Sequence, residues 1–338
     1  MADKNLQQKP RNASIDILKF IAAILITNSH MDKLYIAPFG PLATGGTIGD
    51  ALFFFCSGFT LFLGRIDRFD NWYKRRINRI YPTVFAWAIL SAAIFSNERN
   101  MIDILLGGGY WFISCIMIYY LILYFVRKFA FDKLQIMFIF SCCIVLSVYV
   151  YCCLSKNFLG STFSSSWILR SNNGYFHLIY YFSFMLAGAM LGVSKKQLKI
   201  KTLLDSIKLL TCIVLFYTVF IIGKRNEFIS TIQIIALFSL FGICFYFYKV
   251  CNSNLLTKIY CNKYSGAVIK TIGGLCLEIY IVQFALFTNK MNNIFPANIL
   301  IMFMIIIVAA YILRCVSRIF AQTFKGADYD WKEVVKVY

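Results

Sequence analysis

The chain has 338 residues, of which 60% are hydrophobic and 14% are charged, and its formal net charge is +19. Apolar runs of about 20 residues recur along its whole length, which excludes a soluble globular domain and is typical of polytopic helical membrane proteins. The basic residues fall in short loops between these runs, so nucleic-acid binding is not expected. The chain has twelve cysteines and only two histidines. Neither a disulfide framework nor a Cys/His metal site is expected from them.

Ten apolar segments are predicted to be transmembrane helices of a single all-α membrane domain, without a separate soluble domain. If the N-terminus is cytoplasmic, 24 of the 34 Lys and Arg residues lie on the cytoplasmic side and seven on the other, and three lie inside segments. The positive-inside rule therefore predicts that both tails, 1–14 and 321–338, are cytoplasmic. The predicted segments are 15–34, 47–64, 82–97, 109–126, 134–154, 175–193, 203–223, 229–249, 267–288 and 297–320.

The first segment carries three ionisable residues, Asp16, Lys19 and His30. Lys19 and His30 are eleven residues apart, so they project from one face of a helix, about 16 Å apart along its axis. Charged groups inside a bilayer are costly and usually face a protein interior or a watery cavity. The alternative is that Asp16 and Lys19 lie at one membrane interface and His30 at the other.

The second segment and the loop that follows it offer two further candidate features. Ser57 and Gly58 interrupt a bulky run, which indicates either close helix packing or room for a ligand beside the backbone. The loop 65–82 is strongly basic, and a helix would place Arg76 beside Arg79 on one face. It is either an amphipathic helix at the lipid headgroups or a site for an anionic, phosphate-bearing cofactor. Pro82 is predicted to open the third segment.

Three later positions have two interpretations each. Tyr110 and Trp111 open the fourth segment, where they would belong to an interfacial aromatic belt or cover the apolar face of a sugar. His177 begins the sixth segment and is interpreted as structural. Glu278 lies well inside the ninth segment, where it needs a partner on another helix, water or a proton.

Several motifs together resemble the integral-membrane acyltransferase-3 superfamily, which O-acylates surface glycans and some other acceptors. Their order and spacing match it across nearly the whole chain. Two positions depart from the family pattern, because Lys19 stands where Arg is commoner and Gln283 where many members have His. The motifs are D-x-x-K-x(10)-H (Asp16, Lys19, His30), FFFCSGF (53–59), RRINRIYP (75–82), GGYWFI (108–113), FMLAGAMLG (184–192) and IGGLCLEIYIVQF (272–284).

The resemblance implies an acyl-CoA donor, most often acetyl-CoA, on the cytoplasmic side and a carbohydrate hydroxyl as acceptor on the opposite side, without a metal. A sugar hydroxyl is a poor nucleophile, and a neutral imidazole is the natural general base near pH 7. We therefore expect an O-acyltransferase, acetyl-specific in the first instance, in the cell inner membrane, acting on a surface polysaccharide or its lipid-linked precursor. The expected roles are catalysis by His30 and Lys19, donor binding by Arg75, Arg76 and Arg79, and substrate binding by Trp111, Glu278 and Asp16.

Other functions and mechanisms stay open at this point. A covalent acyl intermediate, for example on His30, is compatible with the same residues, whereas Ser57 has no base close to it in the sequence. A transporter or flippase for a lipid-linked glycan would also use ten spans and an intramembrane Glu278. It would be expected to show repeated halves or helices broken at matching glycines or prolines, and neither is evident. A sensor or scaffold would leave Lys19 and His30 without a purpose.

Overall fold

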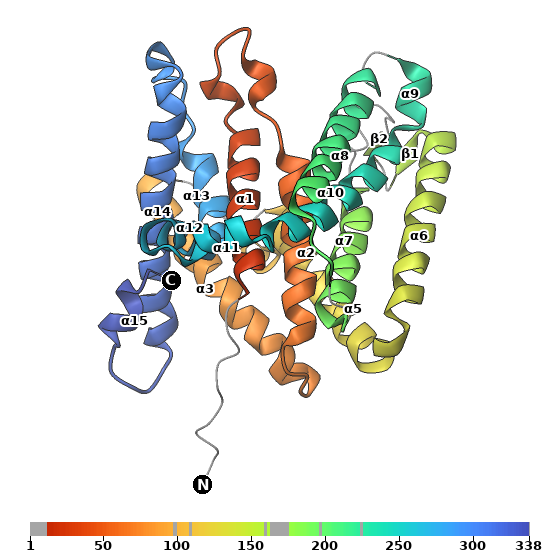
Figure 1. Cartoon of the computed structure of the whole chain (residues 1–338). Helices are drawn as coiled ribbons and strands as arrows, with labels where there is room; N and C mark the ends of the chain where they lie inside the picture. Colours follow the sequence, from red (N-terminus) through yellow and green to blue (C-terminus); the bar gives the residue numbers. More distant parts are fainter. Residues whose placement is uncertain are drawn as a thin grey trace.

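The computed structural model describes residues 12–96, 100–107, 110–158, 161–162, 176–195, 198–223 and 226–337. Within these ranges the chain is helical except for loops and one short antiparallel pair of strands (Figure 1). The all-helical prediction is therefore confirmed. Most of the predicted tail 1–14 lies outside the described residues.

The described helices and strands follow one another along the chain with short connections. The α-helices are α1 (Ala13–Ser29), α2 (Gly46–Leu63), α3 (Phe69–Phe95), α4 (Met101–Leu105), α5 (Trp111–Phe129), α6 (Leu134–Ser155), α7 (His177–Val193), α8 (Thr202–Gly223), α9 (Glu227–Thr231), α10 (Ala236–Cys251), α11 (Asn254–Cys261), α12 (Lys263–Gly274), α13 (Cys276–Leu286), α14 (Ala297–Thr323) and α15 (Trp331–Val335). The 3-10 turns are η1 (Asp32–Leu34), η2 (Gly40–Leu42), η3 (Phe131–Lys133), η5 (Gln233–Ile235) and η6 (Asn292–Ile294), and the strands are β1 (Asn157–Phe158) and β2 (Ser161–Thr162).

Seven helices in the described ranges are long and apolar enough to cross a membrane, and an eighth span results if α12 and α13 are counted together. The seven are α2 with η2, α3, α5, α6 with η3, α8, α10 with η5, and α14. Helices α1 and α7 coincide with the first and sixth predicted segments, but each has 17 residues, which extend over about 25 Å and fall short of a full bilayer core. The predicted total of ten spans stays a prediction.

Helix α3 begins much earlier than predicted. The basic segment before Pro82 is not a loop, because a continuous helix runs from Phe69 through Pro82 to Phe95. Proline removes one backbone donor and usually ends a helix, but membrane helices tolerate it where neighbouring groups satisfy the freed carbonyl. Arg75, Arg76 and Arg79 therefore lie on the same rigid helix that forms the third span.

The ninth predicted segment is broken rather than straight. Helices α12 and α13 meet at Leu275 with a bend of 72°. The glycine pair Gly273–Gly274 directly precedes the break, and glycine is a common cause of sharp kinks. The carbonyl oxygen of Gly274 accepts a hydrogen bond from the Arg314 guanidinium of α14, so the backbone group at the break is satisfied by another helix.

Helix α1 is the centre of the packing and contacts α2, α10, α11, α12 and α13 (Figure 1). Beside it, α2 and α7 cross so closely that each places a glycine on the other's backbone. A Cβ atom on Gly58 would lie 1.8 Å from the Met185 carbonyl oxygen, and one on Gly188 would lie 1.9 Å from the Phe55 carbonyl oxygen. Of the two interpretations of Gly58, the structure shows the close helix crossing.

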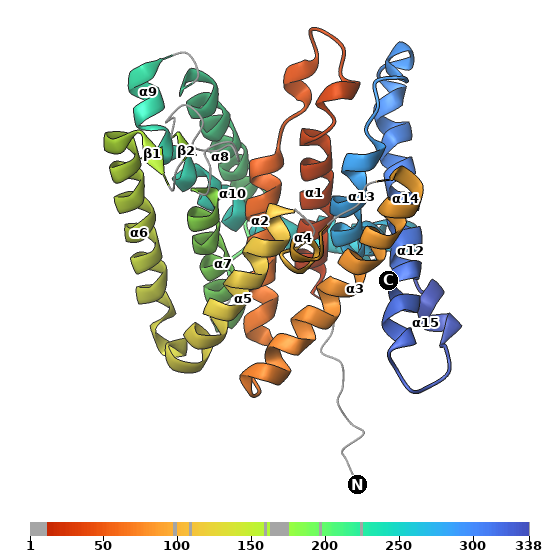
Figure 2. The same ribbon diagram turned by 180° about the vertical axis from the view of Figure 1, so that it is seen from behind.

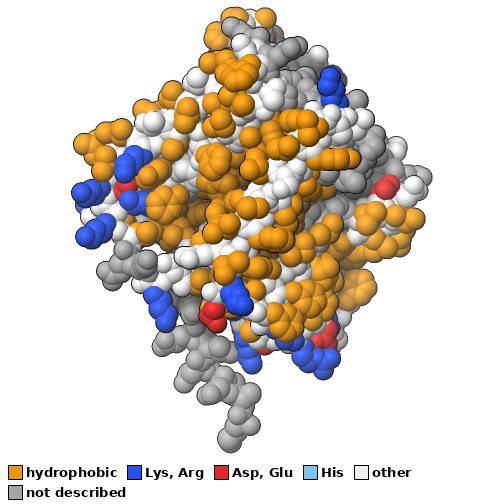
Figure 3. Space-filling view, turned by 90° about the vertical axis from the view of Figure 1, so that its right-hand side faces the viewer, with side chains coloured by type: hydrophobic (Ala, Val, Ile, Leu, Met, Phe, Trp, Pro, Cys, Tyr) orange, Lys and Arg blue, Asp and Glu red, His pale blue; other side chains and the backbone are white. Residues whose placement is uncertain are grey.

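The outer surface of the bundle suits a lipid environment. Viewed from behind, α3, α4 and α5 cover α1 and α2 (Figure 2). Large apolar side chains on α6 point away from the protein, including Leu154, which is 81% exposed, and Phe140, which is 60% exposed. Figure 3 shows a mainly hydrophobic face with Lys and Arg side chains gathered toward its lower rim and one edge. The protein is thus a multi-pass membrane protein.

Candidate active site

A large cavity opens at the C-terminal end of α1. Its volume is about 800 Å³, and His30 lies in its wall. The lining mixes polar groups with aromatic rings contributed by α2, α5, α7, α8, α13 and the loop 30–45. Its residues include Ser29, His30, Asp32, Thr44, Thr47, Asp50, Trp111, His177, Tyr180, Tyr181, Tyr217, Tyr280 and Phe284. The wall can therefore offer hydrogen bonds and flat apolar surfaces to one ligand.

His30 is positioned by the last turn of α1. Its backbone N–H donates to the Thr27 carbonyl oxygen at 3.1 Å, and its ring packs against Phe284 of α13 with 4.8 Å between ring centroids. Among the described residues no side chain forms a hydrogen bond or ion pair with the imidazole. The imidazole is therefore held in place by packing, and its nitrogens remain available to a ligand in the cavity.

A second polar group lies across the same cavity, on α2, α5 and α7. The Tyr181 hydroxyl donates to the Asp50 carboxylate at 3.4 Å. The Trp111 ring meets the His177 ring edge-on at 4.5 Å between centroids and stacks on Tyr181 at 5.8 Å. The structure thus brings the predicted residue Trp111 to the cavity that holds His30. It also adds His177, which had been interpreted as structural, to the same wall.

The predicted donor-binding arginines lie near the opposite end of α1, on the first half of α3. Arg75 is engaged, because it pairs with Asp67 at 2.5 Å and donates to the Arg65 carbonyl oxygen. Arg76 lies over the Trp72 ring, with its guanidinium carbon 3.8 Å from the ring centroid, and donates to the Trp72 carbonyl oxygen. Arg79 is exposed. The three arginines are therefore close in sequence but differ in how free they are to bind an anion.

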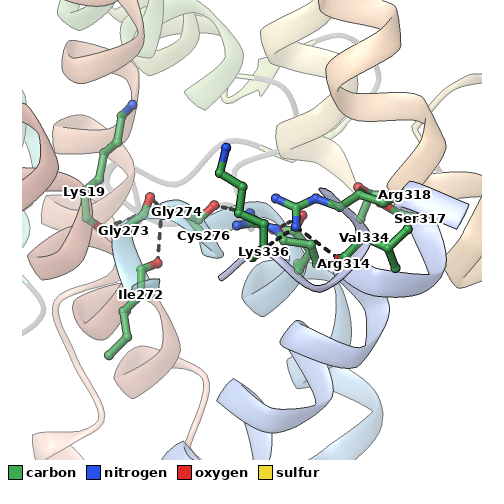
Figure 4. Close-up of polar contacts among 12 residues, drawn as sticks. Lys19, Ile272, Gly273, Gly274, Cys276, Arg314, Ser317, Arg318, Val334 and Lys336 are labelled. Carbon is green, nitrogen blue, oxygen red and sulfur yellow. Dashed lines mark hydrogen bonds and ion pairs between the residues drawn. The ribbon is translucent and has the colours of Figure 1, made fainter. Parts of the chain in front are cut away.

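Lys19 projects from α1 into the protein and lies near enough to Arg79 for the two positive charges to repel each other. Its backbone carbonyl oxygen accepts a weak hydrogen bond from the Cys276 thiol, whereas Figure 4 shows its ammonium group pointing away from Gly273 and Cys276. No described residue forms an ion pair or hydrogen bond with the ammonium of Lys19 or the guanidinium of Arg79. Asp16 also lies within electrostatic range of Lys19, but two neighbouring cations without an ion pair to a described residue favour an anionic ligand between them.

A much smaller cavity lies between the levels of Lys19 and His30. Its volume is about 30 Å³, and it is lined by residues of α1, α2, α5 and α13. Tyr280 lines both this cavity and the large one, whereas Lys19 lines neither. The two predicted catalytic residues therefore do not share one open cavity. They belong to the same helix, and the small cavity lies beside the residues between them.

Two of the predicted substrate-binding carboxylates have partners within the protein. Glu278 of α13 forms two hydrogen bonds with Arg314 of α14, at 3.1 and 2.9 Å, and so finds its partner on another helix, as expected. Asp16 accepts a hydrogen bond from the Tyr260 hydroxyl of α11 at 2.7 Å. Neither carboxylate lines the large cavity. Their substrate-binding roles stay predictions.

Two residues that the structure makes prominent, Arg314 and Asp50, were not predicted to have a role, although the sequence contains a signal for each. Arg314 lies inside the last apolar segment, where a charge demands a partner, but its nearness to the tail had placed it among the cytoplasmic charges. Asp50 lies in the second apolar segment, shortly before an aromatic run, where a carboxylate likewise calls for a partner. Gln283, the position where many relatives have His, is fully buried, and its amide has no hydrogen-bond partner among the described residues.

One of the comparisons with known proteins identifies a family. The acyltransferase-3 family model, described as an acyltransferase domain, matches residues 12–315, which include every helix from α1 to α13 and most of α14. The two glycines of the predicted motif GGYWFI, Gly108 and Gly109, lie outside the described residues. No curated protein and no solved structure matches the chain.

Proposed function

The chain belongs to the acyltransferase-3 superfamily of membrane acyltransferases, and on this premise we propose that it is an O-acyltransferase of polysaccharides. It would transfer an acyl group from cytoplasmic acyl-CoA to a hydroxyl of a surface polysaccharide or its lipid-linked precursor. The acyl group that we expect is acetyl. The observation that carries the proposal is the arrangement along α1. His30 lines a cavity of about 800 Å³ at one end, and at the other end Lys19 and Arg79 lie within electrostatic range of each other with no ion pair to a described residue.

The cationic end suits the donor. Coenzyme A carries a pyrophosphate and a 3′-phosphate, which guanidinium groups bind through paired, charge-assisted hydrogen bonds. Arg79 is free to do this and Arg76 is partly engaged with Trp72, whereas Arg75 would first have to leave Asp67. A pantetheine arm is roughly 15–20 Å long when extended. It can therefore bring a thioester from this end along α1 toward His30.

The large cavity suits the acceptor. Sugars present hydroxyl groups at their edges and apolar faces between them, so a wall that alternates aromatic rings with carboxylates and imidazoles can bind both. Trp111 supplies such a ring, and Asp50 and His177 supply polar groups beside it. The cavity is also large enough for one or two sugar rings, because small-molecule sites usually start near 300 Å³.

His30 would act as the general base in this proposal. Its neutral imidazole accepts the proton as the sugar oxygen attacks the thioester carbonyl carbon, so that the new C–O bond forms while the C–S bond breaks. The proton then passes to the departing CoA thiolate. Lys19 would hold the donor, because its positive charge would attract the negative charge of the phosphates.

A transporter or flippase remains the second candidate because of one observation. The break between α12 and α13 resembles the discontinuous helices that many transporters use at their substrate sites. Here, however, the Arg314 guanidinium donates a hydrogen bond to the Gly274 carbonyl oxygen at the break. The Gly274 carbonyl, which a transporter would offer to its ion or substrate, is therefore already engaged.

The test is transfer of labelled acetyl groups from acetyl-CoA to surface polysaccharide by the purified protein in lipid. We expect label in an ester that dilute base removes. We also expect His30→Ala to abolish transfer, while Thr44→Ala, at a residue of the same cavity with no proposed role, should keep most of the transfer and so control for a general loss of cavity shape. Wild-type transfer by a folded His30→Ala protein would show that the general base is another group. Mass spectrometry of the glycan from cells without this chain would identify the acyl group and the modified sugar.

A further inference from the structure

The small cavity between Lys19 and His30 has a composition that points to a ligand. It is about 30 Å³ in volume, and nearly all of its wall is apolar. Thr27 of α1 belongs to the wall and is fully buried, and Cys276 and Tyr280 are the other lining residues that carry a polar group. The complete lining is Ala23, Ile26, Thr27, Phe53, Phe112, Cys276, Leu277, Ile279 and Tyr280.

The hydroxyl group of Thr27 has no hydrogen-bond partner among the described residues. This is unusual, because a threonine inside a helix commonly satisfies its hydroxyl with the carbonyl oxygen four residues earlier. A buried hydroxyl without a partner is costly, and such groups in native proteins call for an explanation. A ligand with a hydrogen-bond acceptor in this cavity would supply the missing partner.

The position of the cavity identifies the part of a ligand that reaches it. Ala23 and Thr27 follow Lys19 at spacings of four residues, so they lie on the same face of α1 between the cationic end and His30. The backbone of Thr27 is itself hydrogen-bonded to His30, and Tyr280 lines both the small cavity and the large one. A donor that extends from Lys19 would therefore place its acyl end here, next to the general base.

We propose that this cavity is the acyl-group pocket of the enzyme and that it restricts the donor to a two-carbon acyl group, an inference that rests on the proposed function. Thr27 donates its hydroxyl hydrogen to the thioester carbonyl oxygen, and the acyl methyl group fills the space beside Ile279 and Phe53. The acceptor oxygen attacks the carbonyl carbon from the side of the large cavity. The C–O bond forms, the C–S bond breaks, and the proton passes from the acceptor through His30 to the CoA thiolate.

The size of the cavity decides the chain length. The cavity of about 30 Å³ is roughly a fifth of the volume, about 150 Å³, of an apolar protein cavity that accommodates benzene, so it has room for a methyl group and not for a longer chain. Well-packed walls resist extra methylene groups, because neighbouring side chains must leave their preferred rotamers. One methylene in an apolar pocket commonly changes kcat/KM by about tenfold or more. Wild-type protein should therefore prefer acetyl-CoA over propionyl-CoA by at least about tenfold.

The experiment compares acetyl-, propionyl- and butyryl-CoA as donors for wild type and for variants of two isoleucines on α13. Ile279→Ala enlarges the pocket, and Ile279→Val does so more gently in case the larger change prevents folding. Both should shift the preference toward propionyl-CoA, Ile279→Ala by about tenfold or more. Ile281→Ala is the matched control, because Ile281 is equally buried and lines neither cavity. Its donor preference should equal that of wild type.

The role of Thr27 is tested by the turnover rate of enzyme variants at this position. Thr27→Val keeps the shape and removes the donor, so kcat should fall by about 100-fold, as when one oxyanion donor is lost elsewhere. Thr27→Ser should keep most of the rate. Equal use of all three donors by wild type, or the same shift in Ile281→Ala as in Ile279→Ala, would overturn the pocket assignment. Absence of transfer from every donor would instead overturn the proposed function itself.

Discussion

Arg314 satisfies two groups at once in the interior of the protein. Its guanidinium forms a two-point ion pair with Glu278 and donates to the Gly274 carbonyl oxygen at the break between α12 and α13. The side chains of Arg314 and Glu278 are only 13% and 7% exposed. Because water is largely excluded, removing one partner leaves the other as an uncompensated buried charge.

We therefore expect Arg314→Met to lower the free energy of unfolding by about 3 kcal/mol or more. The double variant Arg314→Met with Glu278→Leu should recover part of this loss, because no buried charge is left. Thermal unfolding of the purified proteins in detergent measures both effects. If the single and double variants lost equal stability, the main contribution of Arg314 would be its bond to Gly274 rather than the ion pair.

The difference between Arg75 and Arg79 leads to a second prediction. Arg75 is paired with Asp67 at 2.5 Å, whereas no described residue pairs with Arg79. A hydrogen bond to a charged group contributes about 1.5–3 kcal/mol. Arg79→Ala should therefore raise KM for acetyl-CoA by about tenfold or more, and Arg75→Ala should change it by about twofold at most.

Steady-state kinetics with acetyl-CoA as the varied substrate separates the two arginines. Arg68→Ala provides a control, because Arg68 is an exposed residue near the same end of α3 that pairs only with Asp70. Equal effects of Arg75→Ala and Arg79→Ala on KM would mean that the ion pair with Asp67 opens when the donor binds. A change in kcat alone would place Arg79 in the chemical step rather than in donor binding.

Among elements, the crossing of α2 and α7 depends on two reciprocal glycines. A Cβ on Gly58 or Gly188 would lie within 2 Å of a carbonyl oxygen on the opposite helix, which only a separation of the helices could relieve. Gly58→Ala and Gly188→Ala should each lower stability by about 2 kcal/mol or more, in the range that overpacking of a core produces. Detergent unfolding curves and the yield of monodisperse protein measure the loss.

Gly64 is the control on the same helix. A Cβ there would meet its nearest atom at 3.5 Å, which is ordinary contact, and its φ of −71° suits any residue. Gly64→Ala should therefore leave stability nearly unchanged. If Gly64→Ala destabilised the protein as much as Gly58→Ala, the loss would reflect general sensitivity of α2 rather than the crossing.

The elements also show what the sequence could and could not predict. Long apolar runs predicted the long helices of the bundle, because burial in lipid depends on composition, but they did not predict α11, which lies between two of the predicted segments. Pro82 misled the prediction for α3, since whether a proline ends a membrane helix depends on neighbours that the local sequence does not reveal. The break at Gly274 has the same origin. Two glycines permit a kink, but Arg314, forty residues later, stabilises it.

The site was predictable to a similar extent. The spacing from Lys19 to His30 predicts that both lie on one face of α1, because helix geometry is local, but only His30 lines the large cavity. Contacts between distant helices determine the partners of Glu278 and Asp16. They also determine that His30 lines the same cavity as Trp111 and His177. No local pattern encodes such contacts, so the large and small cavities could only be seen in the fold.

At the scale of the whole molecule, the two ends of α1 have opposite characters. The arginines of α3 and the free ammonium of Lys19 lie toward one end, and the large aromatic cavity with His30 lies at the other. This polarity matches the distribution of Lys and Arg in the loops, which predicts that the Lys19 end faces the cytoplasm. Donor and acceptor would therefore approach α1 from opposite sides of the membrane.

This sidedness predicts how sealed vesicles behave. Acetyl-CoA carries several phosphate charges and cannot cross a bilayer, so it reaches the protein only from the side to which it is added. Inverted membrane vesicles, with their cytoplasmic face outward and acceptor glycan inside, should incorporate label from external acetyl-CoA. Right-side-out vesicles should incorporate at least about tenfold less label. On a free-energy scale a factor of ten corresponds to about 1.4 kcal/mol. Mild detergent should make the two preparations equal, and vesicles with His30→Ala should remain unlabelled throughout. Stronger labelling of the right-side-out preparation than of the inverted one would mean that the donor enters from the side of the large cavity, and the roles of the two ends of α1 would then be reversed.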